Sequence, residues 1–287
     1  MNDEREAPSA TSPTLAPIDG YVAPGFEPVL AQFERNFTEH GEGGAAFAVV
    51  LGGEEIVDLW GGWADRAGAR AWSADTLQII FSGTKGLVAA CALLLLDRGA
   101  LDLAAPVATY WPEFAIRGKE NVTVRDVLTH SAGLPGLDTP VTWQQAMDGR
   151  RMANLLADQP QSKDERAVQT YHALTYGWLV GEIVRRISGR SIGRFFAEEI
   201  GAPLGLDLWI GLPPTEEHRV SKVELAETWG KGATHTPEDL DNDVLLSSIA
   251  ANPVRYRPES FPWNKPAWHS AEVPAVNAIG TARSLAK

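Results

Sequence analysis

Apolar residues near the start of the chain predict one amphipathic helix followed by a β-hairpin. Between residues 26 and 37 they recur at helical spacing, and Gly41 ends the pattern. The apolar run 45–51 has the length of a strand, Gly52-Gly53 turns the chain, and residues 56–60 form the returning strand. Two strands alone do not make a stable sheet. Either the hairpin pairs with strands that the pattern does not reveal, or strands of the fold are absent from this chain.

After residue 82 the pattern changes to helices and loops. We predict helices at residues 82–98, 176–187 and 192–200, and Thr123 to Asp126 has the form of a capping box that opens a short helix. The stretch 213–274 is rich in Pro and Trp and has little periodicity, and 281–287 resembles the first turns of another helix.

The domain organisation expected from these elements is simple. Residues 1–24, which are rich in Pro, Ser, Thr and Ala, are expected to form a flexible arm. One domain then covers residues 25–287, with a sheet part at 25–75 and a mainly helical part at 76–287. The length of 287 residues is enough to bury a substantial core.

The charge and composition exclude several classes of partner. A net charge of −12 argues against nucleic acid and anionic membranes, because both require clustered Lys and Arg. The most apolar run, 87–96, is too short to span a bilayer, and the acidic N-terminus lacks the apolar stretch of a signal peptide. We therefore expect a cytoplasmic protein of undetermined oligomeric state. Cys91, the single cysteine, lies in that run and is expected to be a buried, inert thiol.

Ser82 and Lys85 are the first candidates for chemistry. At a spacing of three on a helix their side chains are neighbours on one face. A serine hydroxyl needs a base to take its proton, and a lysine can act as that base if burial lowers its pKa. The helix start also favours a developing oxyanion through its free N–H groups and dipole. The spacing alone is a weak signal, because Ser284 and Lys287 repeat it at the end of the chain.

The surrounding motifs resemble those of the serine β-lactamase-like superfamily, which includes class C β-lactamases, D-Ala-D-Ala carboxypeptidases and family VIII carboxylesterases. The resemblance runs from about residue 45 to residue 287 and is closest to the carboxylesterase branch. Four motifs occur in the order found in that superfamily: Phe81-Ser-Gly-Thr-Lys-Gly86, Leu128-Thr-His-Ser-Ala-Gly-Leu-Pro135, Tyr171-His-Ala-Leu-Thr-Tyr-Gly177 and Pro203-Leu-Gly-Leu206. Three further segments carry the likeness to carboxylesterases: Val57-Asp-Leu-Trp-Gly-Gly-Trp-Ala-Asp65, Gly177-Trp-Leu-Val-Gly-Glu182 and Leu208-Trp-Ile-Gly-Leu-Pro213.

The resemblance implies roles for individual residues. Ser82 matches the acylated nucleophile, Lys85 its proton partner, and Tyr171 the tyrosine that relays the proton to the leaving group. The family usually has Asn two residues after that tyrosine, where this chain has Ala173. That Asn contacts a substrate amide in β-lactamases and peptidases, so its loss favours esters. His172, next to Tyr171, is a candidate for lining the substrate pocket.

The family's third motif, a Lys-Thr-Gly-like strand that lines the site, has no match after Tyr171. The expected fold is therefore the β-lactamase/transpeptidase-like α/β (α+β) arrangement, an antiparallel sheet flanked by helices plus a helical subdomain, with its C-terminal strands missing. The expected function is a serine hydrolase that cleaves carboxylic esters through an acyl-serine intermediate. The alternatives are a β-lactamase, D-amino peptidase or acyltransferase of the same family, and a catalytically inactive truncated fragment.

Other residue types leave two interpretations open. His130 is either a supporting residue of the site or, more often for such a position, part of a structural loop. A set of tryptophans either walls an acyl pocket or packs in the core and anchors loops: Trp209, Trp229, Trp263 and Trp268. The histidines have no metal-ligand spacing and no Gly-rich phosphate loop is present, so no metal and no cofactor are expected. A small-molecule ester is the expected partner.

Overall fold

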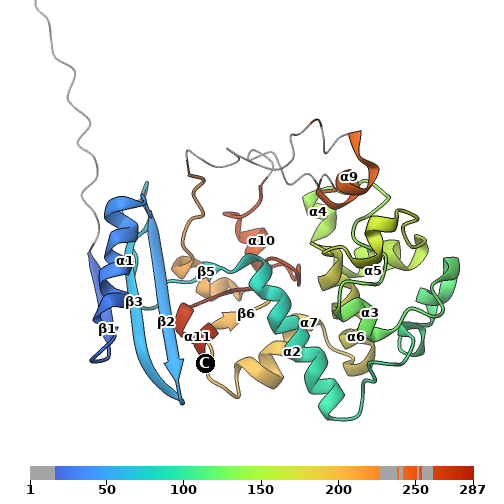
Figure 1. The fold of residues 1–287 in the computed structure, drawn as a ribbon, viewed down its shortest axis with the longest axis horizontal. Coiled ribbons are helices and arrows are strands. Elements are labelled where there is room, and N and C mark those ends of the chain that lie inside the picture. The colour runs from blue at the N-terminus through green and yellow to red at the C-terminus, as the bar shows by residue number, and fades with distance from the viewer. Residues whose placement is uncertain (1–16, 227–237, 239–241, 251, 254–260) are drawn as a thin grey trace, which may run out of the picture. The chain divides into compact units, whose positions relative to one another are not determined.

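The chain forms two compact units. The computed structural model describes residues 17–226, 238, 242–250, 252–253 and 261–287 (Figure 1). One unit comprises Met1–Ala74 with Ala286–Lys287, and the other comprises Asp75–Leu285. Each unit has its own cluster of buried hydrophobic residues.

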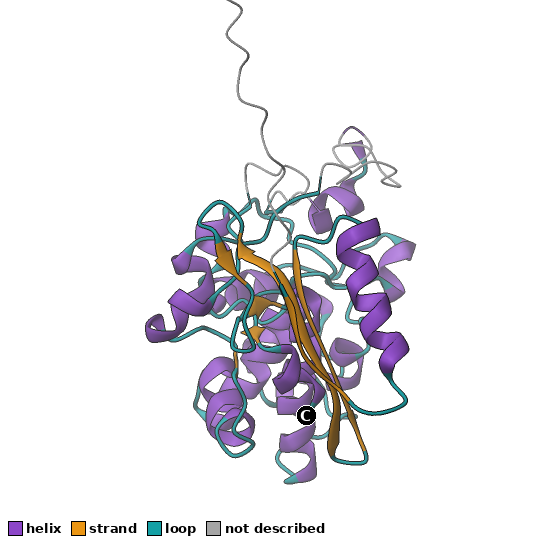
Figure 2. Cartoon of the chain, turned by 90° about the vertical axis from the view of Figure 1, so that its left-hand side faces the viewer, coloured by secondary structure: helices purple, strands orange, loops and turns teal. Residues whose placement is uncertain are grey.

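The first unit is built on an antiparallel sheet (Figure 2). Its strand order is β1-β3-β2, and β4 pairs with the end of β3. The expected hairpin is confirmed, because β2 and β3 pair through most of their length. The expected helix is confirmed as α1. The bounds are β1 Ile18–Val22, α1 Glu27–Glu39, β2 Gly44–Leu51, β3 Glu54–Asp65 and β4 Arg70–Ala71.

Strand β1 corrects the expectation that the flexible arm extends to residue 24. Residues 18–22 pair with β3, so β1 is the strand that the hairpin needed. Gly20 has φ +126, and a Cβ there would lie 2.1 Å from the carbonyl oxygen of Asp58. The close backbone approach therefore requires glycine. A glycine in a five-residue strand interrupts the alternating pattern by which strands are recognised, which is why β1 was missed.

Helix α1 closes one side of the first unit's core. Phe33 and Phe37, one turn apart on α1, are buried in the same cluster as Val57 and Leu59 of β3. The four-residue spacing places both rings on one face of the helix. Burying such a side chain contributes about 1.5–3 kcal/mol each, which is enough to hold a helix of this length against a sheet.

The second unit is mainly helical and contains a small three-stranded sheet of order β5-β7-β6. Its strands have two residues each, too few to leave an alternating pattern. The strands are β5 Gln78–Ile79, β6 Leu208–Trp209 and β7 Ile279–Gly280. The α-helices are α2 Thr84–Asp97, α3 Val124–Leu128, α4 Trp143–Ala146, α5 Gly149–Asp158, α6 Thr175–Ser188, α7 Ile192–Phe196, α9 Val244–Ala250, α10 Pro266–Ser270 and α11 Ala282–Ala286. The shorter helical turns are η1 Phe81–Gly83, η2 Val107–Thr109, η3 Pro112–Gly118, η4 Glu165–Gln169, η5 Ala197–Gly201 and η6 Pro214–Arg219.

Helices α2 and α6 pack against each other at the centre of this unit. The expected helix at 82–98 divides into the turn η1 and α2, and the expected helix at 176–187 is confirmed as α6, which ends at Gly189 with φ +71. Cys91 of α2 is fully buried, and burial raises the pKa of its thiol to about 12. The expectation of a buried thiol is therefore confirmed, and the raised pKa disfavours the reactive thiolate.

Two local predictions had different outcomes. The capping box at Thr123 is confirmed in full, because its hydroxyl accepts the Asp126 N–H and the Asp126 carboxylate accepts the Thr123 N–H. The helix expected at 192–200 ends at Phe196 and continues as the wider turn η5. Within the residues that the structure describes, no helix has the length and apolar character needed to cross a membrane.

Candidate active site

Ser82 lies in the short turn η1, which joins strand β5 to helix α2. The preceding residue, Phe81, has φ +45, a conformation that is rare for a bulky side chain and typical of functional turns. The hydroxyl of Thr84 donates to the Phe81 carbonyl at 2.6 Å and accepts the Ala278 N–H at 2.9 Å. These bonds attach the turn to the segment that leads into β7, so the exposed Ser82 is held by a fixed backbone.

Lys85 is the buried partner of Ser82. Its Nζ lies 3.4 Å from Ser82 Oγ, 2.8 Å from the carbonyl oxygen of Ala173 and 3.0 Å from that of Ala275. The residue is only 7% exposed. The three acceptors come from separate segments of the second unit, and together they fix the position of the amine beside the serine.

The two backbone carbonyls that accept hydrogen bonds from Lys85 were not predicted from the sequence. A backbone acceptor has no signature in residue type, because every residue carries one. In the structure, one of the two carbonyls is positioned by Asn277, which is fully buried and folds the loop before β7 on itself. Its side chain accepts the Val273 N–H and donates to the carbonyls of Trp268 and Ala271, and this presents Ala275 to Lys85.

Tyr171 lies near the lysine, after the turn η4. The Nζ of Lys85 is 4.7 Å from the centre of the Tyr171 ring, and the tyrosine is 48% exposed. The structure therefore brings Ser82, Lys85 and Tyr171, the three predicted catalytic residues, into one group around the lysine amine. Ala173, at the position of the family's Asn, contributes its carbonyl oxygen to that group.

His172 occupies a different position from the one expected of a substrate-binding residue. Its side chain is fully buried, Nε2 accepts the Leu134 N–H at 3.2 Å, and Nδ1 donates to the carbonyl of Thr170 at 2.6 Å. Burial lowers the pKa of His172 to about 4. With both nitrogens bonded to backbone, the ring joins two loops, so the geometry favours a structural role over substrate contact.

An aromatic cluster begins at the residue before the nucleophile. The exposed ring of Phe81 packs edge-on against Trp263 at 5.5 Å, and Trp263 contacts Trp143 and Trp268 at 5.3 and 5.4 Å. Of the predicted tryptophan set, Trp268 is in the core, and Trp263 packs against the core and also reaches the turn of Ser82. Trp209 belongs to strand β6, and Trp229 lies outside the described residues.

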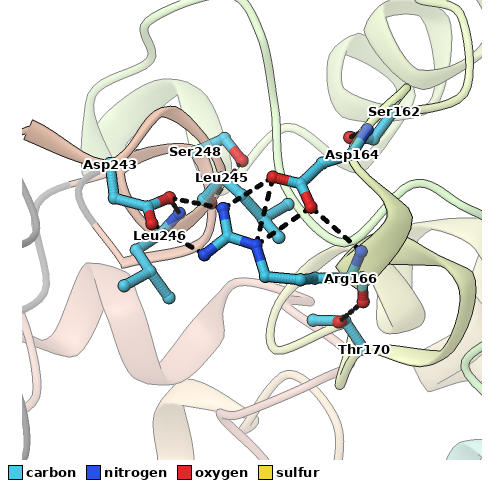
Figure 3. Close-up of polar contacts among 8 residues, drawn as sticks. All are labelled: Ser162, Asp164, Arg166, Thr170, Asp243, Leu245, Leu246 and Ser248. Carbon is cyan, nitrogen blue, oxygen red and sulfur yellow. Dashed lines mark hydrogen bonds and ion pairs between the residues drawn. The ribbon is translucent and has the colours of Figure 1, made fainter.

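The segment that leads into Tyr171 is tied to helix α9 by Arg166. Figure 3 shows its guanidinium between the carboxylates of Asp164 and Asp243, with contacts of 2.6–3.0 Å to the nearest oxygens. Asp243 also accepts the Leu246 N–H in the first turn of α9. The Thr170 hydroxyl donates to the Arg166 carbonyl. A single arginine thus connects α9 to the residues just before the tyrosine.

Comparison with solved structures supports the expected fold. A structure described as a family VIII carboxylesterase superposes with a TM-score of 0.83 at 36% identity, covering 93% of this chain and 69% of that one. The structure of EstA from Arthrobacter nitroguajacolicus Rue61a superposes with a TM-score of 0.78 at 29% identity, covering 92% of this chain and 67% of that one. The β-lactamase/transpeptidase-like fold, with antiparallel strands and a helical part, is confirmed.

Sequence comparison gives the family. Esterase/beta-lactamase LipL from Mycobacterium tuberculosis is 37% identical over 283 residues, which are 94% of this chain and 63% of LipL. Esterase EstB from Burkholderia gladioli is 30% identical over 61% of this chain and 49% of EstB. The chain thus spans less than two thirds of the length of these two relatives. The family model described as Beta-lactamase matches residues 30–287. This chain belongs to the Beta-lactamase family.

Proposed function

We propose that the chain carries the acylation centre of a serine hydrolase that cleaves carboxylic esters. The observation that carries the proposal is the position of the Lys85 amine, 3.4 Å from Ser82 Oγ and held by two backbone carbonyls. A neutral amine has two N–H groups and one lone pair. When the two N–H groups donate to Ala173 and Ala275, the remaining lone pair is left for the serine hydroxyl.

The proposed reaction has two steps. Lys85 accepts the hydroxyl proton while Ser82 Oγ bonds to the ester carbonyl carbon, and the carbonyl oxygen becomes an oxyanion near the start of α2, where the helix dipole stabilises negative charge. The C–O bond to the alcohol then breaks, and the proton passes from Lys85 through the Tyr171 hydroxyl to the leaving alkoxide. Water later bonds to the acyl carbon while Lys85 takes a proton from it. The bond from that carbon to Ser82 Oγ then breaks, Lys85 returns the proton to Oγ, and the carboxylic acid is released.

Two observations favour esters over β-lactams and peptides. Ala173 stands where the family has an Asn that contacts a substrate amide, and its methyl group makes no hydrogen bond. The name of EstB is that of an esterase alone, and the name of LipL carries both esterase and beta-lactamase. The leaving group of an ester is an alkoxide, which is expelled more easily than the nitrogen leaving group of an amide or β-lactam. Loss of the contact to a substrate amide therefore slows ester cleavage less than amide cleavage.

The test is covalent labelling of Ser82. The purified chain is incubated with an activated fluorophosphonate and its intact mass is measured. We expect one adduct in the wild type and none in Ser82→Ala. Ser284→Ala is the matched control, because Ser284 has a lysine at the same spacing but is buried and bonded to the Asp207 N–H. This control is expected to retain the adduct.

Substrate preference is tested next with p-nitrophenyl esters and a chromogenic cephalosporin. Turnover of the esters with little turnover of the cephalosporin supports the proposal. Equal turnover of both would overturn the ester assignment while keeping the nucleophile. A chain that melts cooperatively but forms no adduct would overturn the proposed function of this chain.

A further inference from the structure

His130, which none of the proposed steps uses, lies beside the tyrosine of the site. Its ring centre is 4.8 Å from that of Tyr171, 4.8 Å from that of Tyr176 and 5.7 Å from that of His172. Its backbone has φ +62, a left-handed conformation that is uncommon for a residue other than glycine. Such strain persists only where the surroundings determine it, and it occurs often at functional sites.

One hydrogen bond fixes the protonation state of this ring. The backbone N–H of His172 points to Nδ1 of His130 at 3.0 Å. A backbone amide can only donate, so Nδ1 must be an unprotonated acceptor, and the neutral ring carries its proton on Nε2. The bond also attaches the His130 ring to the peptide that follows Tyr171. Protonation of Nδ1 would place two N–H groups against each other and break that attachment.

The surroundings oppose that protonation. In the described chain, the titratable groups that interact with His130 are Lys85, Tyr171, Tyr176 and His172. Burial raises the pKa of Tyr176 to about 12 and lowers that of His172 to about 4, so both stay neutral at neutral pH and neither stabilises a protonated His130 by charge. Burial lowers the pKa of His130 below 6.5, and the positive charge of Lys85 in its protonated form lowers it further. The site therefore keeps His130 neutral at neutral pH.

We propose that neutral His130 is a positioning residue that holds Tyr171 beside Lys85, and that protonation of His130 releases Tyr171 and closes down the site in acid. The proposal deepens and rests on the proposed function of Ser82, Lys85 and Tyr171. Because Tyr171 is half-exposed, its ring is held mainly by the groups beside it, which include Lys85 and His130. Loss of the His130 contact frees the hydroxyl that would carry the proton to the leaving group.

The chain offers a conservative variant that separates attachment from titration. In His130→Asn, the side-chain oxygen can accept the His172 N–H much as Nδ1 does, asparagine tolerates a left-handed backbone, and the amide does not titrate. In His130→Ala the acceptor and the ring are both lost. His218→Asn is the matched control, because His218 is an exposed histidine of the same unit.

The first readout is the rate of fluorophosphonate labelling between pH 4 and 8. We expect His130→Ala to label about ten-fold to a hundred-fold more slowly at pH 7.5, as misplaced catalytic groups do, and His130→Asn to restore most of that loss. Below neutral pH, the labelling rates of the wild type and of His218→Asn should fall more steeply than protonation of a single group explains. The labelling rate of His130→Asn should fall as expected for protonation of one group. If the labelling rates of the wild type and His130→Asn fall with the same pH dependence in acid, the proposal is overturned.

The second readout does not depend on catalysis, so it separates failure of this proposal from failure of the proposed function. The ring protons of Tyr171, assigned with Tyr171→Phe, and the Cε1 proton of His130 are followed by NMR from pH 4 to 8. We expect both to shift with one midpoint in the wild type, and the Tyr171 shift at that midpoint to vanish in His130→Asn. If the Tyr171 ring protons do not shift when His130 titrates, the proposal is overturned, whether or not Ser82 forms an adduct.

Discussion

The carbonyl oxygen of Ala275 lies 3.0 Å from the amine of Lys85, although the two residues are 190 positions apart in the chain. The motif that places Ser82 in η1 and Lys85 in the first turn of α2 is therefore completed by a loop near the other end of the sequence. That loop has a buried polar side chain at its centre, Asn277, whose three hydrogen bonds hold its shape. The position of the amine therefore depends on the loop that this asparagine holds as well as on α2.

The first prediction is that Asn277→Ala weakens both the fold and the site. Removal of the amide leaves a buried N–H, a buried carbonyl and a partly buried carbonyl without the Asn277 partner, at a cost of about 3 kcal/mol in unfolding free energy. We also expect slower fluorophosphonate labelling of Ser82, because Ala275 is no longer held toward Lys85. Urea denaturation and the labelling rate measure the two effects.

Asn264 provides the control for that experiment. It bonds to the backbone of Val223 at both ends of its amide but is exposed. Asn264→Ala should change the unfolding free energy by less than about 1 kcal/mol and leave labelling unchanged. If the two alanine variants lose equal stability, burial of the Asn277 bonds is not what holds the loop.

The second prediction compares two buried lysines. Lys119 is fully buried, and its Nζ donates to the carbonyls of Ile116, Ala157 and Gln159 at 2.5–3.0 Å. It resembles Lys85 in burial and in its carbonyl partners, but no serine hydroxyl is among its recorded acceptors. Lys85→Met should lower the labelling rate of Ser82 by about 10²–10⁴-fold, which is the usual contribution of a general base.

Lys119→Met should have the opposite profile. It leaves one buried carbonyl and two partly buried ones without their donor, so we expect a loss of about 3 kcal/mol in unfolding free energy and labelling of the folded fraction at the wild-type rate. Denaturation curves and labelling under native conditions separate the two variants. Equal labelling losses in both folded variants would mean that the lysine near Ser82 has no special role.

These lysines also show what the sequence could reveal. Ser82, Lys85 and Tyr171 were predictable because their residue types and order form recognisable motifs, and the structure brings them together. Lys119 carries no such motif, so nothing in the sequence marks it as buried. The partners of Lys85 were hidden for a related reason, because backbone carbonyls leave no trace in the sequence and only the fold selects which of them converge.

The same distinction explains the fold. Helices α1 and α6 were predictable because long periodic runs create an apolar face over several turns. Helix α2 was predictable because its continuous apolar run has helical length and stops near Gly99. Strand β1 was missed because Gly20 interrupts a five-residue pattern, although its close approach to Asp58 is the reason for that glycine. Two-residue strands such as β5 are defined by their partners in space rather than by their own sequence.

The third prediction concerns close packing between α6 and the loop of Ala275. A Cβ at Gly177 would lie 2.4 Å from the Pro274 carbonyl carbon and 2.5 Å from the Ala275 nitrogen. Both are backbone atoms that cannot move independently of the loop. Gly177→Ala should therefore destabilise the chain by about 1–3 kcal/mol and slow the labelling of Ser82, because the loop that orients Lys85 is displaced.

Gly86, which follows Lys85 directly, is the contrasting position. A Cβ there has nothing within 4 Å, and the residue lies inside α2 with an ordinary helical backbone. Gly86→Ala should raise the unfolding free energy by about 0.5–1 kcal/mol through helix propensity and backbone entropy. If Gly86→Ala lost as much stability as Gly177→Ala, the space available to the added Cβ would not be what determines the change in unfolding free energy.

The fourth prediction is a loss of stability in mild acid caused by His172. Burial lowers the pKa of this histidine from 6.5 to about 4, so the folded state holds it neutral while the unfolded state takes up a proton. Stability is therefore complete above pH 6.5 and falls as the pH decreases toward 4. Between pH 6.5 and 5 the loss attributable to His172 should be about 2 kcal/mol.

Urea denaturation at pH 7, 6 and 5 measures this slope. His172→Gln, which keeps a donor and an acceptor without titrating, should flatten it even if the variant is less stable at pH 7. His218→Asn should leave the slope unchanged, because that histidine is exposed. Equal slopes for the wild type and His172→Gln would exclude His172 as the source.

The fifth prediction concerns Arg166, which connects helix α9 to the segment before Tyr171 (Figure 3). The guanidinium beside Asp243 lowers the pKa of that carboxyl to about 2, so the pair stays ionised in ordinary buffers. Arg166→Lys replaces a planar fork by a single ammonium, which cannot make paired bonds to both carboxylates. We expect amide exchange in α9 to rise by about ten-fold in Arg166→Ala and by less in Arg166→Lys.

The matched control is Arg194→Ala, which removes an exposed ion pair with Glu198 on another helix of the same unit. Because exposed pairs one turn apart contribute only about 0.3–0.5 kcal/mol, this variant should leave exchange in α9 unchanged. The Arg166 contacts differ because they join segments 77 residues apart, so their loss frees a whole helix end rather than one side chain. If Arg194→Ala accelerates exchange in α9 as much as Arg166→Ala, the effect is one of net charge, and Arg166 does not hold the helix.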